Sequence, residues 1–345
     1  MFFSNALRTS KFRKLILVGL AILGVMVALP LTRKTDPSEE EIPCTTLEGF
    51  GKPVQALAFS PDGKTLATGD GWLIRAGDVK LTRIGGVKLW DVNAGTERVS
   101  IGEFPNAIKS LEYSPDGKIL AIGCYDGTAR LWDLLLGQYS RAFPSSEGVQ
   151  YMVAFSPDSR TLATWGSIDY VQLRDLNTGD EQTVRGVIGP VAFCRDDHPL
   201  KIARFHNATI CNAPRLLGLA VDRLMPWSFV FSPDGHNVAV TGFDGAVIVW
   251  DVYSGEERIT IPGHHGQVNA VAFSPDGKII ASGNFDGTVQ LWAVATGEEL
   301  ACFRGHTRSV TALAFASDGQ KIASASYDQT ARIWHLGDVR KKIGR

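Results

Sequence analysis

Apolar and polar residues alternate in many short stretches of the chain, as at Val268, Ala270 and Ala272. Successive side chains of a β-strand point to opposite faces, so a period of two predicts strands. Each stretch is followed by Ser-Pro-Asp-Gly or a variant of it. In such a turn Pro61 presets φ at the second position and Gly63 takes the fourth. The pattern therefore predicts antiparallel strands joined by tight turns.

These stretches belong to a repeat. The aromatic residue of Ala-Phe-Ser-Pro-Asp-Gly recurs at Phe59, Tyr113, Phe155, Phe193, Phe231, Phe273 and Phe315. In the sixth copy a second strand, Lys278–Ser282, leads through an Asp286-Gly287 turn to a third strand ending at Trp292, and a fourth covers 299–303. Four short strands cannot bury both faces of their own sheet, so neighbouring units are expected to pack side by side.

Two dipeptides identify the repeat. Trp-Asp closes three units, at Trp90-Asp91, Trp132-Asp133 and Trp250-Asp251, and Gly-His opens others at Gly263-His264 and Gly305-His306. Over residues 44–337 the chain resembles the WD-repeat β-propeller family. The resemblance implies an all-β, seven-bladed propeller of four-stranded antiparallel blades. It also implies a hydrogen-bonded structural tetrad inside a blade, matched here by His264, Ser282, Asp286 and Trp292, and by His306, Ser324, Asp328 and Trp334.

Some units depart from the pattern. The seventh ends after its third strand, followed by a basic tail at 338–345, and residues 45–50 match 301–306 in register. We therefore expect the start of the domain to supply the missing strand. The third unit has Arg174-Asp175 for Trp-Asp. The fourth lacks the Trp, and Leu200–Arg204 and Thr209–Cys211 can serve as its middle strands.

The N-terminus carries a different signal. A basic segment, residues 1–14, precedes an uncharged apolar run from Leu15 to Leu31, and a polar linker follows at 32–43. The run is long enough to predict a single transmembrane helix. The positive charges before it place the N-terminus in the cytoplasm and the propeller outside. A cleaved signal peptide, giving a secreted or periplasmic protein, is the alternative.

Candidate partner-binding residues fall on the expected top face, which carries the loops between second and third strands. The first unit has an insertion there containing Trp72 and Arg75, residue types that anchor interfaces. An aromatic residue precedes the turn in five units: Tyr125, Phe205, Phe243, Phe285 and Tyr327. The same aromatics could instead pack against neighbouring blades. Lys109, Asn269 and Thr311 are expected to line the mouth of the central channel.

Composition and missing motifs exclude several classes of function. Lys and Arg total 35 against 36 Asp and Glu, which gives no electrostatic case for nucleic-acid binding. The five Cys indicate neither a disulfide scaffold nor a zinc site. No nucleophile elbow, zinc-protease motif or phosphate loop occurs. His198 and His206 are the only candidate metal ligands, and they belong to none of these motifs, so we expect no metal. Because the catalytic motifs are missing, we also expect no catalytic residues and no cofactor. The sequence predicts a membrane-tethered, non-catalytic scaffold that binds a protein or peptide on the top face. An exported propeller hydrolase or a small-ligand sensor is the alternative.

Overall fold

The computed structural model describes residues 43–72, 85–144, 150–166, 170–185, 191–193, 200–204, 209–212, 215–218, 228–241, 245–262, 266–337 and 339. The chain divides into two units, Met1–Glu41 and Ile42–Arg345. All described residues belong to the second unit. Residues 15–31, where the sequence predicts a transmembrane helix, lie outside them.

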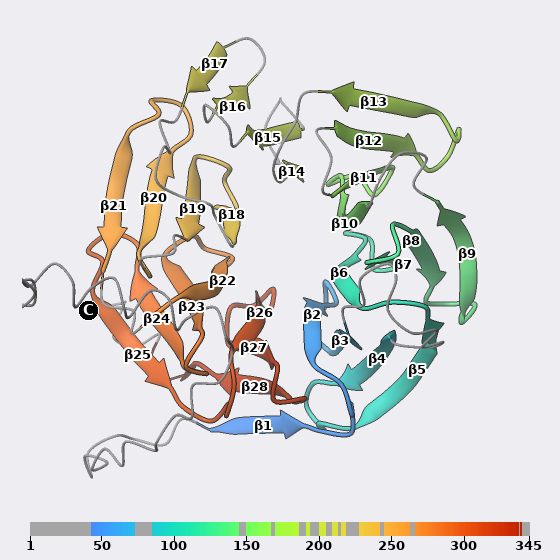
Figure 1. Cartoon of the computed structure of the whole chain (residues 1–345), viewed down its shortest axis with the longest axis horizontal. Helices are drawn as coiled ribbons and strands as arrows, with labels where there is room; N and C mark the ends of the chain where they lie inside the picture. Colours follow the sequence, from blue (N-terminus) through green and yellow to red (C-terminus); the bar gives the residue numbers. More distant parts are fainter. Residues whose placement is uncertain are drawn as a thin grey trace, which may run out of the picture. The chain divides into compact units, whose positions relative to one another are not determined.

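The described residues form seven four-stranded antiparallel sheets, set around a central axis (Figure 1). The strands are β1 (Cys44–Leu47), β2 (Val54–Phe59), β3 (Thr65–Gly71), β4 (Gly85–Asp91), β5 (Glu97–Phe104), β6 (Ile108–Tyr113), β7 (Ile119–Cys124), β8 (Ala129–Asp133), β9 (Gln138–Phe143), β10 (Gln150–Phe155), β11 (Thr161–Gly166), β12 (Tyr170–Asp175), β13 (Glu181–Arg185), β14 (Val191–Phe193), β15 (Leu200–Arg204), β16 (Thr209–Asn212), β17 (Arg215–Gly218), β18 (Phe229–Phe231), β19 (Asn237–Thr241), β20 (Val247–Asp251), β21 (Glu257–Ile261), β22 (Val268–Phe273), β23 (Ile279–Asn284), β24 (Val289–Ala293), β25 (Glu299–Phe303), β26 (Val310–Phe315), β27 (Lys321–Ser326) and β28 (Ala331–His335).

The repeated turns have the predicted geometry. The Gly63 amide donates to the Ser60 carbonyl at 2.8 Å, and Gly63 has a positive φ of 67°, which glycine adopts without strain. The Ser60 hydroxyl donates to Asp62 at 2.6 Å and accepts the Thr65 amide at 2.9 Å. The turn therefore satisfies its own polar groups. Because the strands are antiparallel, these turns and those between third and fourth strands lie on one face, the bottom face, opposite the top face.

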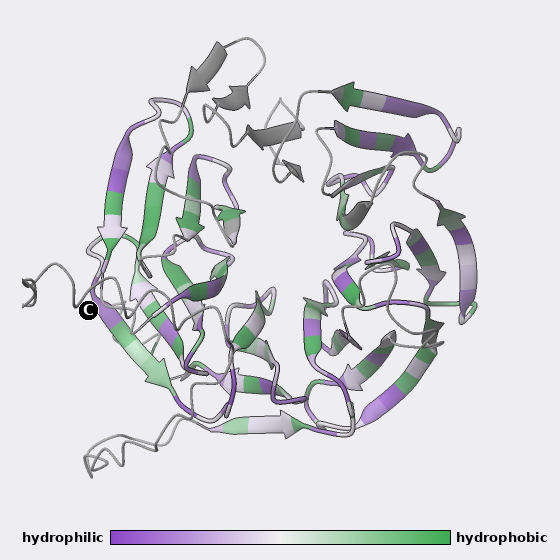
Figure 2. Ribbon diagram, viewed as in Figure 1, coloured by the Kyte–Doolittle hydropathy of each residue, from purple (hydrophilic) through white to green (hydrophobic). Residues whose placement is uncertain are grey.

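Apolar side chains fill the space between consecutive blades. One cluster joins Ile101 and Phe104 of the first blade to Ile108, Leu120 and Ile122 of the second. In Figure 2 the middle strands β19 and β20 are mostly apolar, whereas the outer strands β5, β13 and β21 carry more polar residues. Burial of apolar side chains between blades therefore contributes to the stability of the propeller.

The two ends of the propeller share one blade. β1 pairs antiparallel with β28, with Cys44 opposite Trp334 and Leu47 opposite Ala331. The His335 amide also donates to the Pro43 carbonyl at 3.1 Å. The predicted closure is confirmed, and the pairing leaves no open edge on β28.

The predicted fold class, seven packed blades preceded by a transmembrane helix, is corrected in two respects: the number of packed blades and the helix. Packed blades with described buried side chains account for six of the sheets. The sheet of β14 to β17 is described by its backbone strands alone, although β15 and β16 match the predicted middle strands. Its repeat lacks both the Trp and the Ser-Pro-Asp-Gly turn that are present in most of the other blades. Within the described part of the chain, no helix is long and apolar enough to cross a membrane.

Candidate partner-binding surface

Backbone hydrogen bonds hold the loops of the top face. In three blades the amide of the aromatic residue before the turn donates to a carbonyl in the loop that enters the same blade. The pairs are Tyr125 with Ala107 at 2.9 Å, Phe285 with Gln267 at 2.9 Å, and Tyr327 with Ser309 at 3.0 Å. The three aromatic residues therefore occupy equivalent, backbone-anchored positions.

The side chains at these positions differ in exposure. Phe285 is 64% exposed and Tyr327 is 38% exposed, whereas Tyr125 is half-buried. Trp72, at the start of the insertion, is 47% exposed. Phe285 and Tyr327 are therefore surface residues rather than core residues. The other predicted members of the surface, Arg75, Phe205 and Phe243, lie outside the described residues.

The three residues expected at the channel mouth connect neighbouring blades. Lys109 Nζ donates to Gln55 Oε1 at 2.6 Å, and Gln55 Nε2 donates to the Gly71 carbonyl at 2.6 Å. Burial lowers the pKa of Lys109 to about 8. Asn269 Nδ2 contacts Ser309 Oγ at 2.5 Å, and Thr311 Oγ1 donates to the Val54 carbonyl at 2.5 Å. Their polar groups are thus engaged within the propeller, and the sequence analysis missed the part played by Gln55.

The structure joins the four tetrad residues of the seventh blade. His306 Nδ1 lies 2.9 Å from Asp328 Oδ2, His306 Nε2 lies 2.8 Å from Ser324 Oγ, and Trp334 Nε1 donates to Ser324 Oγ at 2.9 Å. Burial alone would raise the pKa of Asp328, but hydrogen bonds from His306 and Thr330 hold it below its ordinary value. The tetrad fixes the loop that presents Tyr327, which is a structural task.

In the sixth blade the structure describes three of the four tetrad residues, and in the third blade another residue replaces the Trp. Trp292 Nε1 donates to Ser282 Oγ at 3.0 Å, and Asp286 accepts the Thr288 hydroxyl at 2.6 Å, while His264 lies outside the described residues. In the third blade Arg174, only 4% exposed, takes the place of the Trp. Its Nη1 donates to Thr164 Oγ1 at 2.8 Å, so it reproduces the hydrogen bond of the Trp.

Metal ligation has no support among the described residues, where no three His, Cys, Asp or Glu side chains gather in a ligating group. His198 and His206, the loose candidates from the sequence, lie outside that part of the chain. Cys44, Cys124 and Cys302 form no disulfide bond within the part of the chain that the structure describes.

Comparison with protein families agrees with the repeat pattern. The model for the WD domain, G-beta repeat, matches residues 41–75, 225–251, 255–293 and 297–335. The model for the anaphase-promoting complex subunit 4 WD40 domain matches residues 71–156. The two models together leave residues 157–224 unmatched, the region of the altered third and fourth units.

Several curated proteins are similar to parts of the chain. Actin-interacting protein 1 of Drosophila melanogaster is 29% identical over 196 residues, covering 48% of this chain and 29% of that protein. Transducin beta-like protein 3 of Rattus norvegicus is 37% identical over 155 residues, covering 45% and 15%. The U3 small nucleolar RNA-associated protein 4 homolog of Mus musculus is 24% identical over 168 residues, covering 48% and 21%. The chain thus spans less than a third of the length of each.

The relatives bear on two further predictions. None of the three names describes a catalytic activity, so the chain resembles WD-repeat proteins that are not named as enzymes. None refers to a membrane either. With no membrane-spanning helix among the described residues, the prediction of a single-pass membrane protein with an extracytoplasmic propeller is corrected. The matched repeats and the blade geometry identify the chain as a WD40-repeat β-propeller.

Proposed function

We propose that this propeller is a non-catalytic scaffold that binds a protein or peptide partner through the aromatic residues of its top face. The observation that carries the proposal is the exposure of Phe285 and Tyr327 at equivalent loop positions of adjacent blades. A large aromatic side chain left in water loses the free energy that burial would provide. Aromatic residues are also enriched at the centres of protein interfaces.

The loops suit this role because their backbones are already anchored. Backbone hydrogen bonds from Phe285 to Gln267 and from Tyr327 to Ser309 fix the main-chain positions from which the two rings extend. A partner then meets a preorganised surface and loses less conformational entropy on binding. Trp72 and Arg75, with Tyr125, Phe205 and Phe243, are proposed to extend the same surface.

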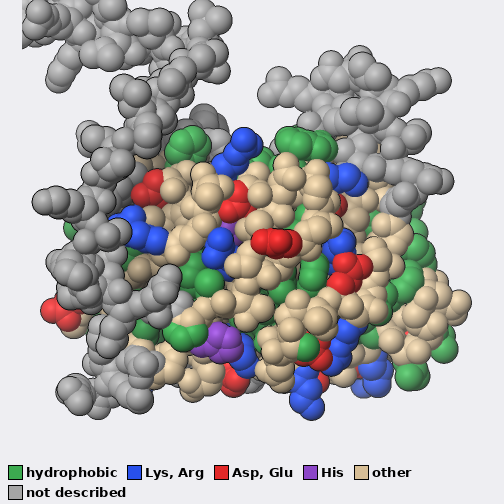
Figure 3. All heavy atoms as spheres, turned by 90° about the horizontal axis from the view of Figure 1, so that it is seen from below, with side chains coloured by type: hydrophobic (Ala, Val, Ile, Leu, Met, Phe, Trp, Pro, Cys, Tyr) green, Lys and Arg blue, Asp and Glu red, His purple; other side chains and the backbone are tan. Residues whose placement is uncertain are grey.

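Charge supports a protein partner. The formal net charge is −1, and on the side drawn in Figure 3 acidic and basic side chains are interspersed over the described surface. Nucleic-acid binding relies on clustered Lys and Arg. The name of the Drosophila relative, actin-interacting protein 1, gives a protein, actin, as the partner of that relative.

The test is an affinity capture from cell extract with the full chain, compared with a Phe285→Ala, Tyr327→Ala double variant. The matched control is Tyr253→Ala, which removes an exposed aromatic from a turn of the bottom face. We expect a partner that the wild type and the control retain and the double variant loses, with melting temperatures alike. Equal capture by all three would contradict the proposal.

A further inference from the structure

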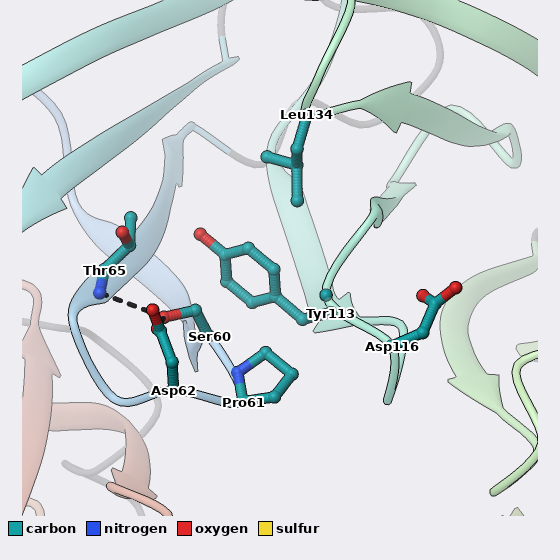
Figure 4. A pocket seen from close by; sticks show the side chains of 8 residues that line it. Ser60, Pro61, Asp62, Thr65, Tyr113, Asp116 and Leu134 are labelled. Carbon is teal, nitrogen blue, oxygen red and sulfur yellow. Dashed lines mark hydrogen bonds between the residues drawn. The ribbon is translucent and has the colours of Figure 1, made fainter.

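A pocket opens between the first and second blades on the bottom face. Its volume is about 420 Å³, within the range of ligand-sized cavities. Figure 4 shows it lined by the two Ser-Pro-Asp-Gly turns of these blades and by Tyr113 at the end of β6. The lining residues are Ser60, Pro61, Asp62, Thr65, Tyr113, Asp116, Gly117 and Leu134.

Tyr113 sets this pocket apart from the other inter-blade spaces. The other six repeats have Phe at this position, for example Phe59 and Phe273. The Tyr113 side chain is only 6% exposed, and its hydroxyl has no hydrogen-bond partner among the described residues. In Figure 4 the hydroxyl points into the space between Thr65 and Leu134. Buried tyrosine hydroxyls ordinarily find a partner, so this one indicates a ligand.

Two carboxylates give the pocket its charge. Asp62 Oδ1 accepts the Ser60 hydroxyl at 2.6 Å, and Asp116 Oδ1 accepts the Ser114 hydroxyl at 2.7 Å. These hydrogen bonds lower the pKa of both carboxyl groups, so both are ionised at neutral pH. Both aspartates are exposed, and Asp116 Oδ2 lies 3.3 Å from the largely exposed Lys118 Nζ. The pocket therefore offers negative charge to a cationic group and repels an anion.

The surface beside the pocket is apolar. Leu134 lines the pocket, and the next two residues, Leu135 and Leu136, are 90% and 65% exposed. Asp133 Oδ1 accepts both of their amides, at 2.9 and 2.8 Å, and so holds the turn in place. The corresponding turns of other blades carry smaller or more polar pairs, such as Asn93-Ala94 and Asn177-Thr178.

We propose that the pocket receives an arginine side chain of a protein partner, and that apolar residues next to this arginine cover Leu135 and Leu136. A guanidinium is always charged and presents several N–H donors in one plane, so a single group can donate to a carboxylate and to a hydroxyl oxygen. The exposed leucines supply apolar area for a macromolecule. The site lies on the opposite face from the proposed aromatic surface and does not depend on it.

The test measures binding of a short labelled peptide, one arginine flanked by leucines, to the full chain by fluorescence anisotropy. A second peptide carries citrulline, which has nearly the shape of arginine without the charge. We expect the citrulline peptide to bind at least tenfold more weakly. Equal affinities, or no binding of the arginine peptide up to millimolar concentration, would overturn the proposal.

Substitutions in the pocket test whether the arginine peptide binds there. Tyr113→Phe installs the residue of the other repeats, so we expect an unchanged melting temperature and about tenfold weaker binding. Asp62→Asn keeps an acceptor for Ser60 and removes the charge, with a similar loss expected. Asp276→Asn makes the same change in the sixth blade, where Asp276 also accepts from a serine, and should bind like wild type.

The same assay separates the two surfaces. The Phe285→Ala, Tyr327→Ala variant should bind the arginine peptide normally. Weaker binding by this variant, with normal binding by Tyr113→Phe, would place the peptide on the top face and refute the pocket. Normal binding by Tyr113→Phe and Asp62→Asn together would also refute it. Neither result depends on capture of a top-face partner.

Discussion

At the scale of the residue, phenylalanine has two different environments within the sixth blade. Phe285 lies in a loop of the top face, and Phe303 lies at the end of β25. Phe285 is 64% exposed, whereas Phe303 is 2% exposed and stacks on Trp334 with ring centroids 5.1 Å apart. The repeat copies aromatic residues into both positions. Only the surroundings decide which of them stabilises the fold.

We predict that Phe285→Ala changes the free energy of unfolding by less than about 1 kcal/mol, because the ring is already hydrated. Phe303→Ala should cost about 3–5 kcal/mol, since it leaves a cavity beside Trp334. Urea unfolding of the two variants measures both values. Similar losses would show that Phe285 packs as a core residue.

Asp70 gives a prediction about pH. It is 5% exposed, and burial raises the pKa of its carboxyl to about 6, although Lys52 and Lys88 partly oppose the shift. The unfolded chain releases this proton near pH 4 and the folded chain near pH 6. The free energy of unfolding should therefore fall as the pH rises through this window, and the loss is complete above about pH 6.

Asp70→Asn removes that titration. Asn284 holds the equivalent position in the sixth blade, so the substitution suits the fold. We expect the variant to be more stable than wild type at pH 8, on the order of 2 kcal/mol. Its stability should also vary less between pH 4 and 6. Thermal melts across this range give the comparison, and parallel curves for the two proteins would contradict the assignment.

At the scale of the element, the third blade shows how a blade tolerates a departure from its repeat. Arg174 replaces the Trp, donates to Thr164 and pairs with Glu181 at 2.8 Å. Its guanidinium carbon also lies 4.9 Å from the centre of the Phe143 ring in the preceding blade. Arg174 therefore links β11, β12 and β13 with the neighbouring sheet.

We predict that Arg174→Ala destabilises the chain by about 3 kcal/mol, because it removes the centre of a buried network. Arg174→Lys should cost nearly as much, since an ammonium cannot reproduce the planar donor set. Arg174→Trp should fold best of the three, because Thr164 can accept from its indole as Thr68 does from Trp90 at 2.9 Å. Denaturant midpoints rank the variants, and a ranking with Ala above Trp would contradict this role.

At the scale of the whole molecule, stability depends on the pairing of β1 with β28. Leu47 in β1 is 1% exposed and packs with Trp90, Ala331 and Ile333 from both sides of the closure. Without β1, β28 would present unpaired backbone groups to solvent, which favours association with other chains.

Leu47→Asp tests the closure against Glu48→Lys, a change of charge at the adjacent exposed residue. We expect Leu47→Asp to cost at least about 3 kcal/mol, because it buries an unpaired charge, and to produce oligomers at high protein concentration. Glu48→Lys should behave like wild type. Light scattering and thermal melting report both effects. Monomeric behaviour and equal stability of the two variants would show that the closure contributes little.

The sequence by itself determined the elements, because strand periodicity, turn chemistry and repeat length depend on residues close together in the chain. These patterns predicted the hairpins, the tetrad of the seventh blade and the closing strand. Only the tertiary structure decided what each side chain meets across the blade boundary. It left Phe285 exposed, placed Arg174 in the position of a Trp, and gave the Tyr113 hydroxyl no hydrogen-bond partner among the described residues. Periodicity indicates which face of a strand a residue takes. Exposure and hydrogen bonding depend on the neighbouring blade, which the local pattern does not contain.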